Sequence, residues 1–230
     1  MMQKKVIVIS LGGSLIVPDE IDVSLLNKFK KVLKKHSSRY KFVVVTGGGS
    51  IARKYISALK QAGKSEYFQS MAGISTTRTN ARFMTYLFGK DANEGIPHDM
   101  SQVKNLLNRH DIVFCGALRY AEHETSDGTA AKLANFFNTT FINLTNVSGL
   151  YTSNPLTYKN AKFISKISWK DFYKRANSIS FKPGQHFVLD QKAAELIMKN
   201  KTPTYILGRD MKNLNLLLSG KRFKGTIISD

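Results

Sequence analysis

Two apolar runs that end in glycine decide the fold: VIVISLGGS at residues 6–14 and FVVVTGGGS at residues 42–50. β-Branched residues fill both runs with little polar alternation, as is typical of parallel strands that are buried on both faces. Each glycine cluster directly follows its strand, where it permits a tight turn and lets a ligand approach backbone N–H groups. The two stretches therefore predict neighbouring strands whose carboxyl ends carry ligand-binding loops.

Working outward, short apolar runs recur at residues 112–115, 141–144, 204–207 and 226–228, and helical patterns lie between them. Ile51, Tyr55 and Leu59, for example, are spaced four apart. We also expect a short helix near residues 100–108. The segment 150–184 is polar and mixed, and could form a lobe over the sheet. This alternation predicts a three-layer α/β/α sandwich with a mostly parallel sheet.

Length and composition limit the class of protein. The chain has 230 residues, of which 42% are hydrophobic, enough for one sizeable core. A single cysteine, Cys115, excludes an intrachain disulfide and indicates a reducing compartment. The apolar run 6–11 is too short for a signal peptide, and no run approaches the roughly 18 residues of a membrane span. We expect a soluble, cytoplasmic protein without a membrane partner.

The chain is strongly basic, with 35 Lys and Arg against 16 Asp and Glu and a net charge of +19. Such a balance favours polyanionic or phosphorylated partners. Seven of the basic residues lie between Lys28 and Lys41, interleaved with apolar residues at helical spacing. This pattern predicts an amphipathic helix with a solvated basic face. Nucleic-acid binding is the weaker interpretation, because no zinc-finger, RNP or KH signature is present.

The second glycine cluster has the chemistry of a phosphate site. A helix is expected from Ile51, so its positive dipole end would face the loop, and Arg53 in the first turn could reach back over it. Alone, either loop could simply join a strand to a helix. The string Gly47-x-Gly49-x-x-Ala52 also fits a dinucleotide fingerprint, but the acidic residue expected about twenty residues on is missing from a strand end, since Glu66 looks helical. A P-loop is excluded, because no G-x-x-x-x-G-K-[ST] occurs.

Two later segments add polar groups. Thr125 can cap the following helix and place Asp127 in its first turn. This segment is either a well-capped helix or a nucleotide-contacting turn with a carboxylate near the transferred phosphoryl group. The loop at residues 145–155 follows a buried strand. It is either a plain connection or a base-binding loop with Tyr151 as its aromatic wall.

Other catalytic schemes find little support. The five histidines form no H-x-x-x-H motif or Cys/His cluster, which argues against a zinc site. Cys115 ends an apolar strand and is expected in the core rather than as a nucleophile. No G-x-S-x-G elbow occurs. The stretch FKPGQHF at residues 181–187 is interpreted as an ordinary loop, with a subunit or lid contact as the alternative.

The ordered set of motifs resembles the amino acid kinase superfamily, and within it the archaeal-type UMP kinases. That family shows G-G-S, G-G-G-x-x-A-R-K-Y, G-I-x-x-T-R-x-N-A, T-T-D-x-x-A-A, T-N-V-D-G-V-Y-T-x-D-P and V-x-D-x-x-A-A in this order. The matching segments here begin at Gly12, Gly47, Gly73, Thr125, Thr145 and Val188. The resemblance spans nearly the whole chain.

The resemblance implies a carbamate kinase-like fold in one domain, residues 1–230. Its half up to about residue 140 would bind the acceptor and the rest would bind ATP. It further implies transfer of a phosphoryl group from ATP to UMP, Mg²⁺ carried by ATP with no metal ligand from the protein, and a homo-oligomer, commonly a hexamer.

The site residues follow from the same resemblance and from the glycine-loop chemistry above. The proposed catalytic residues are Arg53 and Asp127. The expected ATP-binding residues are Gly13, Ser14, Gly49, Arg53, Thr145, Tyr151 and Asn154. The expected UMP-binding residues are Gly47, Gly48, Ser70, Arg78, Arg119, Glu124 and Thr125. Asp190 stands where acetylglutamate kinase-like relatives place a lysine.

Several positions depart from the family pattern. Ser10 replaces a lysine that many superfamily members carry at the strand end, and Ser70 replaces an aspartate that holds the ribose. Ser148 and Asn154 replace two aspartates, and the loop 118–124 is longer and lacks the usual glycine. Two alternatives therefore stay open. One is a kinase of this fold with another small phosphate or carboxylate acceptor, and the other is a non-catalytic nucleotide- or oxyanion-binding relative.

Overall fold

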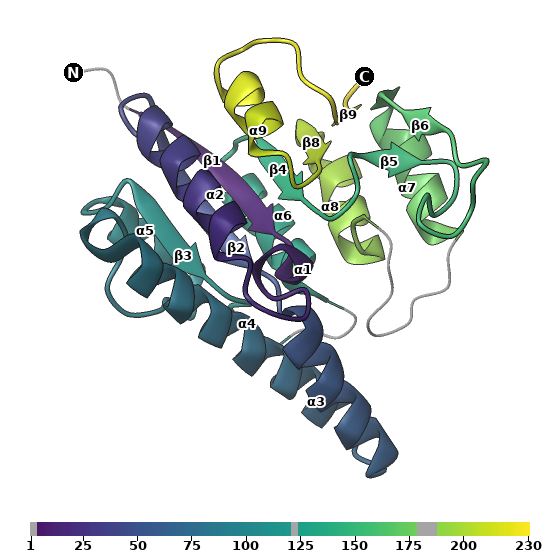
Figure 1. Cartoon of the computed structure of the whole chain (residues 1–230), viewed down its shortest axis with the longest axis horizontal. Coiled ribbons are helices and arrows are strands. Elements are labelled where there is room, and N and C mark those ends of the chain that lie inside the picture. Colours follow the sequence, from purple (N-terminus) through teal and green to yellow (C-terminus); the bar gives the residue numbers. More distant parts are fainter. Residues whose placement is uncertain (1–3, 121–123, 179–187) are drawn as a thin grey trace.

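A seven-stranded sheet forms the centre of the part of the chain that the computed structural model describes, which is residues 4–120, 124–178 and 188–230 (Figure 1). The strand order is β3-β2-β1-β4-β8-β9-β7. The strands are β1 (Lys5–Leu11), β2 (Tyr40–Thr46), β3 (Ile112–Cys115), β4 (Phe141–Leu144), β7 (Lys166–Ile167), β8 (Thr204–Leu207) and β9 (Thr226–Ile228). The six strands predicted from the apolar runs are therefore all confirmed.

The pairing within the sheet is mostly parallel, as expected. Strands β3, β2, β1, β4 and β8 run in the same direction, and β9 pairs antiparallel with β8. Residues of β1 alternate between two apolar clusters, with Ile7 and Ile9 on one face and Val8 on the other. Burial on both faces explains why the strand sequences show little polar alternation.

Helices cover both faces of the sheet. One apolar cluster joins it to α1 (Gly13–Ile16), α2 (Val23–His36), α4 (Glu66–Phe88) and α9 (Met211–Leu218). The other cluster joins it to α5 (Met100–Leu107), α6 (Ser126–Phe136), α7 (Trp169–Asn177) and α8 (Gln191–Asn200). The three-layer α/β/α sandwich is thus confirmed. No helix among the described residues is long and apolar enough to cross a membrane.

Two parts of the chain extend beyond the sandwich. Helix α3 (Gly49–Gln61) and the first half of α4 project together from the carboxyl edge of the sheet (Figure 1). The polar segment after residue 150 forms a two-stranded ribbon, β5 (Leu150–Tyr151) with β6 (Phe163–Ile164), followed by β7 and α7. The expected lobe is therefore a ribbon, an edge strand and a helix; residues 179–184 lie outside the described residues.

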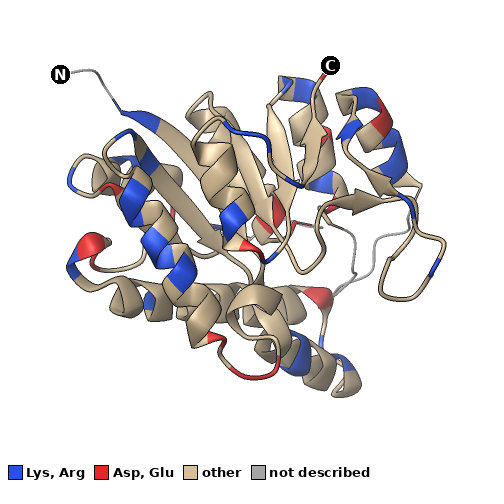
Figure 2. Ribbon diagram, turned by 45° about the horizontal axis from the view of Figure 1, so that its top comes forward, with Lys and Arg blue, Asp and Glu red and all other residues tan. Residues whose placement is uncertain are grey.

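The basic stretch forms helix α2, in which Leu25, Leu26, Phe29 and Leu33 are buried and most of the lysines are exposed. Figure 2 shows in blue where these lysines lie along the ribbon. Some of these lysines have local partners. The Lys34 ammonium lies 2.7 Å from Asp91, and Lys30 donates to the Leu87 carbonyl at 2.8 Å. The predicted amphipathic helix is confirmed.

Candidate functional site

The glycine loops after β1 and β2 pack directly against each other. A Cβ atom on Gly13 would lie 2.0 Å from the Gly49 nitrogen, and one on Gly47 would lie 2.4 Å from the Gly13 nitrogen. Gly49 also has a φ of +67°, a conformation that other residues rarely adopt. The sequence suggested that glycine is needed here so that a ligand can approach the backbone. The structure gives a second reason for glycine, which is direct contact between the backbones of the two loops.

Both loops open into one cavity of about 1130 Å³ at the carboxyl edge of the sheet. We call the part of the cavity that is lined by α3, the start of α4, Ala117, Tyr120 and residues 124–127 its first arm. The second arm is the part that is lined by residues 145–147, residues 149–156, the end of α7 and residues 188–191. Since β1 and β2 are parallel neighbours, their loops reach the same edge. The two loops therefore share one cleft, with space for a ligand on either side.

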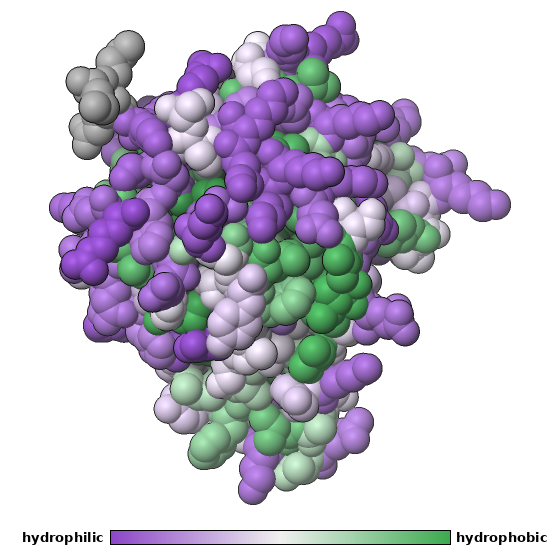
Figure 3. Space-filling view, turned by 60° about the vertical axis from the view of Figure 1, so that its left-hand side comes forward, coloured by the Kyte–Doolittle hydropathy of each residue, from purple (hydrophilic) through white to green (hydrophobic). Residues whose placement is uncertain are grey.

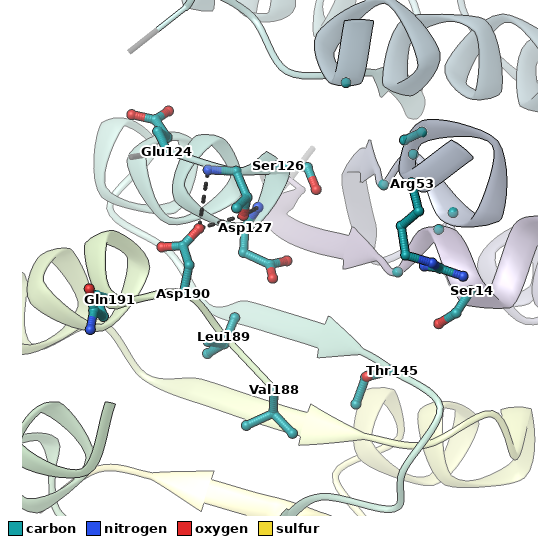
Figure 4. A pocket seen from close by; sticks show the side chains of 18 of the residues that line it. Ser14, Arg53, Glu124, Ser126, Asp127, Thr145, Val188, Leu189, Asp190 and Gln191 are labelled. Atoms are coloured by element: carbon teal, nitrogen blue, oxygen red, sulfur yellow. Dashed lines mark hydrogen bonds between the residues drawn. The ribbon is translucent and has the colours of Figure 1, made fainter. Parts of the chain in front are cut away.

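Helix α3 begins at Gly49, two residues earlier than predicted. Arg53 therefore lies one turn inside the helix rather than in its first turn. Its side chain is exposed, lines the cavity and points toward Ser14 of the other loop (Figure 4). This geometry fits the expected reach of the guanidinium across the glycine loops.

Opposite Arg53 and Ser14, Asp127 and Asp190 lie side by side in the cavity wall (Figure 4). Thr125 caps α6 as predicted: its hydroxyl accepts from the Asp127 N–H at 3.1 Å. The Thr125 N–H and hydroxyl both donate to Asp190, the N–H at 3.2 Å. Asp190 in turn caps α8 by accepting from the Ala193 N–H at 2.6 Å. Two helix starts are thereby joined at the cavity.

Ser10 belongs to the same network. Its hydroxyl, fully buried at the end of β1, donates to the Asp127 carboxylate at 2.6 Å. Burial of Asp127, and next the nearby Asp190 carboxylate, raise the pKa of Asp127 to about 7, while the Ser10 hydrogen bond lowers it. Asp127 therefore changes its protonation state close to neutral pH.

The expected ATP-side residues all line the cavity. The Tyr151 ring packs edge-on against Phe163, with 5.4 Å between centroids. The Asn154 side chain closes a local turn by accepting from the Leu156 N–H at 3.0 Å. Arg175 was not predicted; it donates to the Thr152 carbonyl at 2.5 Å and lines the same arm. Its position on α7 could not be inferred from the loop sequence.

The expected UMP-side residues divide into two groups. Gly47, Gly48, Ser70, Glu124 and Thr125 line the cavity. The Glu124 carboxylate is paired with Lys132 and accepts from the Thr129 hydroxyl at 3.2 Å.

Arg78 and Arg119 are not among the residues that line the cavity. Arg78 donates to the carbonyls of Ala117, at 3.1 Å, and Leu118. The Arg119 side chain is 81% exposed and lies 3.7 Å from Asp99. The structure thus gives both arginines protein partners, and contact of either with UMP stays a prediction.

The charge lining the cavity differs from that of the whole chain. The lining includes the cations Arg53 and Arg175 and the carboxylates Glu66, Glu124, Asp127 and Asp190. Most of the +19 net charge therefore lies elsewhere on the protein. Backbone N–H groups of the glycine loops and the start of α3, rather than a cluster of lysines, supply positive potential for an anion here.

Two other expectations concern residues outside this cluster. Cys115 is buried in β3, and burial raises the pKa of its thiol to about 12, so it is a core residue as predicted. Among the described residues, no three His, Cys, Asp or Glu side chains form a group that could hold a metal ion. The predicted loop at residues 181–187 lies outside the described part of the chain.

Comparisons with known proteins agree with this architecture. The model of the amino acid kinase family matches residues 5–208. A uridylate kinase of Thermoplasma volcanium is 36% identical over 217 residues, covering 94% of this chain and 93% of the relative. A crystal structure of uridylate kinase from Archaeoglobus fulgidus superposes with a TM-score of 0.84 at 30% identity, covering 97% of this chain and 99% of the other. A UMP kinase structure from Ureaplasma parvum, 22% identical with a TM-score of 0.80 over 100% of both chains, has the same fold.

Two apposed glycine loops, a helix start and a carboxylate share one cleft at the edge of the sheet. These features define a phosphate-binding α/β protein of the kind that transfers phosphoryl groups. The chain belongs to the amino acid kinase family.

Proposed function

We propose that this protein transfers the terminal phosphoryl group of ATP to UMP, forming UDP and ADP. The observation that carries the proposal is the single cavity of about 1130 Å³ that both glycine loops, Arg53 and Asp127 line. Relatives and one solved structure named uridylate kinase, 30–36% identical over nearly the whole chain, support the choice of UMP as acceptor.

In the proposed arrangement, the arm beside α3 and α4 binds UMP and the arm beside β5 and α7 binds ATP. This places the acceptor mainly on the half up to about residue 140 and the donor on the rest. The glycine loops and Ser14 line the same cavity, and in this arrangement they lie where the two ligands meet. Their N–H groups and the Arg53 guanidinium hold the oxygens of the phosphoryl group while it is transferred.

A phosphate oxygen of UMP attacks the terminal phosphorus of ATP, and the bond to the ADP oxygen breaks. The second ionisation of a phosphate monoester falls near pH 6, so UMP is nucleophilic at neutral pH without a general base. Asp127, ionised above pH 7 and held by Ser10, orients water or a cation beside the phosphates. Phosphoryl transfer of this kind depends on positioning and electrostatics rather than on a covalent enzyme intermediate.

Magnesium fits this site as a companion of ATP. In this proposal the ion is held mainly by the donor phosphates and water. When bound, Mg²⁺ neutralises charge on those phosphates. A protein that uses ATP and UMP in this way acts where both are present, in the cytoplasm. The homo-oligomer that the resemblance implies stays a prediction.

An ADP-release assay with a panel of acceptors tests the proposal. The panel contains UMP, CMP, isopentenyl phosphate and acetylglutamate, each with ATP and Mg²⁺. We expect UMP to give the highest kcat/KM. A higher value for another acceptor would assign a different kinase activity to the same fold. Tight nucleotide binding without turnover of any acceptor would indicate a non-catalytic binding protein.

A further inference from the structure

Two tyrosine side chains from separate parts of the chain meet in the lining of the acceptor arm. Tyr67 lies in the first turn of α4, and Tyr120 lies in the loop that follows β3. Their ring centroids are 5.0 Å apart and their planes meet at 78°. Both rings line the cavity and both are partly exposed, Tyr67 by 49% and Tyr120 by 37%.

The rings are therefore held in place by each other but are not buried in the core. Edge-to-face contact fixes the orientation of each ring while leaving a ring face open to a ligand. An exposed aromatic face in a cavity is suited to stacking on a planar base, since every base has a π-face. The pair therefore offers a preoriented aromatic surface to a planar heterocycle.

The same cavity is lined by a carboxylate that has no partner among the described residues. Glu66, the first residue of α4, lines the cavity and makes no hydrogen bond or ion pair with the described residues. Ser70 lies one helical turn further on the same face and also lines the cavity. A carboxylate accepts hydrogen bonds through two oxygens, which matches the paired hydroxyls of a ribose.

The charges that line the cavity favour one orientation of the bound acceptor. Glu66 would repel a phosphate, whereas the glycine loops and Arg53 attract one. A nucleotide is anionic at one end and uncharged at its sugar and base. The favourable orientation places the phosphate at the glycine loops and the nucleoside beside Glu66 and the two tyrosines.

From this geometry we infer that Tyr67, Tyr120 and Glu66 form the nucleoside-recognition site of the acceptor. Since the two ring planes are nearly perpendicular, one tyrosine stacks its face on the base and the other contacts the edge of the base, while Glu66 accepts hydrogen bonds from the ribose hydroxyls. The inference rests on the proposed function, because it assumes a nucleoside monophosphate as acceptor. It assigns acceptor recognition to residues of the α4 start and the β3 loop, beyond those proposed from the sequence.

Steady-state kinetics of Tyr67→Leu, Tyr120→Leu and Glu66→Gln test the assignment. Tyr86→Leu is the matched control, because Tyr86 lies on the same helix, is 71% exposed and is not among the cavity-lining residues. Loss of the ring that stacks on the base, or of the ring that holds it in orientation, should raise the KM for UMP by roughly 5- to 100-fold. The KM for ATP should not change, and the control should behave as the wild type.

Two ligands related to UMP separate recognition of the base from recognition of the sugar. Ribose 5-phosphate, tested as an inhibitor that competes with UMP, lacks the base, so Tyr67→Leu should leave its inhibition constant unchanged. Deoxy-UMP lacks one ribose hydroxyl, so Glu66→Gln should reduce the preference for UMP over deoxy-UMP by roughly 5-fold or more. An unchanged KM for UMP in both tyrosine variants, or an unchanged preference in Glu66→Gln, would overturn the inference.

A calorimetric titration with UMP distinguishes failure of this inference from failure of the proposed function. If the wild type binds UMP without phosphorylating it, the proposed function fails, yet weaker binding by Tyr67→Leu would still support the site. If the wild type phosphorylates UMP and both tyrosine variants bind it normally, the site is wrong and the function stands.

Discussion

Replacing Ser10 by alanine tests whether the network at the end of β1 controls Asp127. The Ser10 hydroxyl is fully buried and donates to the Asp127 carboxylate at 2.6 Å. This bond stabilises the ionised form of Asp127 and opposes burial and the Asp190 carboxylate, which bring its pKa to about 7. Without the hydroxyl, the pKa of Asp127 should rise further.

The size of the effect follows from the strength of the bond. A hydrogen bond to a charged group contributes about 1.5–3 kcal/mol, which corresponds to roughly one to two pH units. In the proposed mechanism the ionised form of Asp127 is the active one. The rising limb of kcat/KM should therefore shift to higher pH by that amount in Ser10→Ala. Because half of the wild-type Asp127 is already protonated at pH 7, activity there should fall about 7- to 80-fold, and it should recover at higher pH.

The assay is kcat/KM for UMP between pH 5.5 and pH 10, with Ser10→Thr as the control. Threonine retains the hydroxyl, so this variant should keep the wild-type profile. The UMP phosphate also titrates near pH 6, but it does so equally in all three proteins. Superimposable profiles for Ser10→Ala and the wild type would refute the role of this hydrogen bond. So would a uniform loss of activity at every pH.

Three further predictions follow from the same geometry. Arg53→Ala should lower kcat by about 10²- to 10³-fold through lost transition-state stabilisation. Lys54→Ala is the control and should leave kcat unchanged, because Lys54 is adjacent in sequence but does not line the cavity. Equal kcat values for Arg53→Ala and the wild type would contradict the assignment. Asp127→Asn should stabilise the unliganded protein by up to about 4 kcal/mol at pH 8 and by less than half of that at pH 5. The reason is that a carboxyl group with a raised pKa contributes stability that is lost as pH rises through about 7. Urea unfolding at both pH values measures the difference, and a difference that does not depend on pH would contradict the prediction. Gly13→Ala should prevent stable folding, since its Cβ would lie 2.0 Å from the Gly49 nitrogen, while Gly73→Ala, inside α4 with its nearest contact at 3.5 Å, should be neutral or raise stability by about 1 kcal/mol in thermal unfolding.

The fold was predictable because burial dictates its sequence pattern. Strands covered on both faces need continuous apolar residues, and all six predicted strands form in the structure. The strands β5, β6 and β7 are two residues each, too short to show a period. Helix α4 is long, but it is buried in part and projects in part, so its apolar residues do not lie along one stripe and it was not delimited from the sequence.

The parts of the candidate site that could be predicted are those that a pattern of neighbouring residues encodes. Glycines directly after strands marked both loops, and the Thr125 cap placed Asp127. Contacts between distant segments were not predictable: Ser10 meets Asp127 across 117 residues, and Thr125 meets Asp190 across 65. Asp190 had been noted only as a family marker, yet it forms part of the cavity wall. Such pairs depend on strand order and helix packing, which no local pattern encodes.

One further surface bears on assembly. Figure 3 shows hydrophilic residues over the upper half of one face and apolar residues gathered on its lower half, where Figure 1 places α3 and α4. Ile51, Tyr55 and Phe68, on these two helices, are exposed by 36%, 57% and 55%. If the predicted homo-oligomer forms through these helices, Tyr55→Glu should reduce the molar mass measured by light scattering. An unchanged mass would place any interface elsewhere.

Calorimetric titration with a bisubstrate ligand, adenosine and uridine joined through a chain of five phosphates, tests most directly whether donor and acceptor share the cavity between the two glycine loops. We expect one molecule to bind per chain, more tightly than ATP or UMP alone, and neither nucleotide to bind once the site is filled. Binding that displaces only one of the two nucleotides, or binding of two molecules per chain, would contradict this expectation.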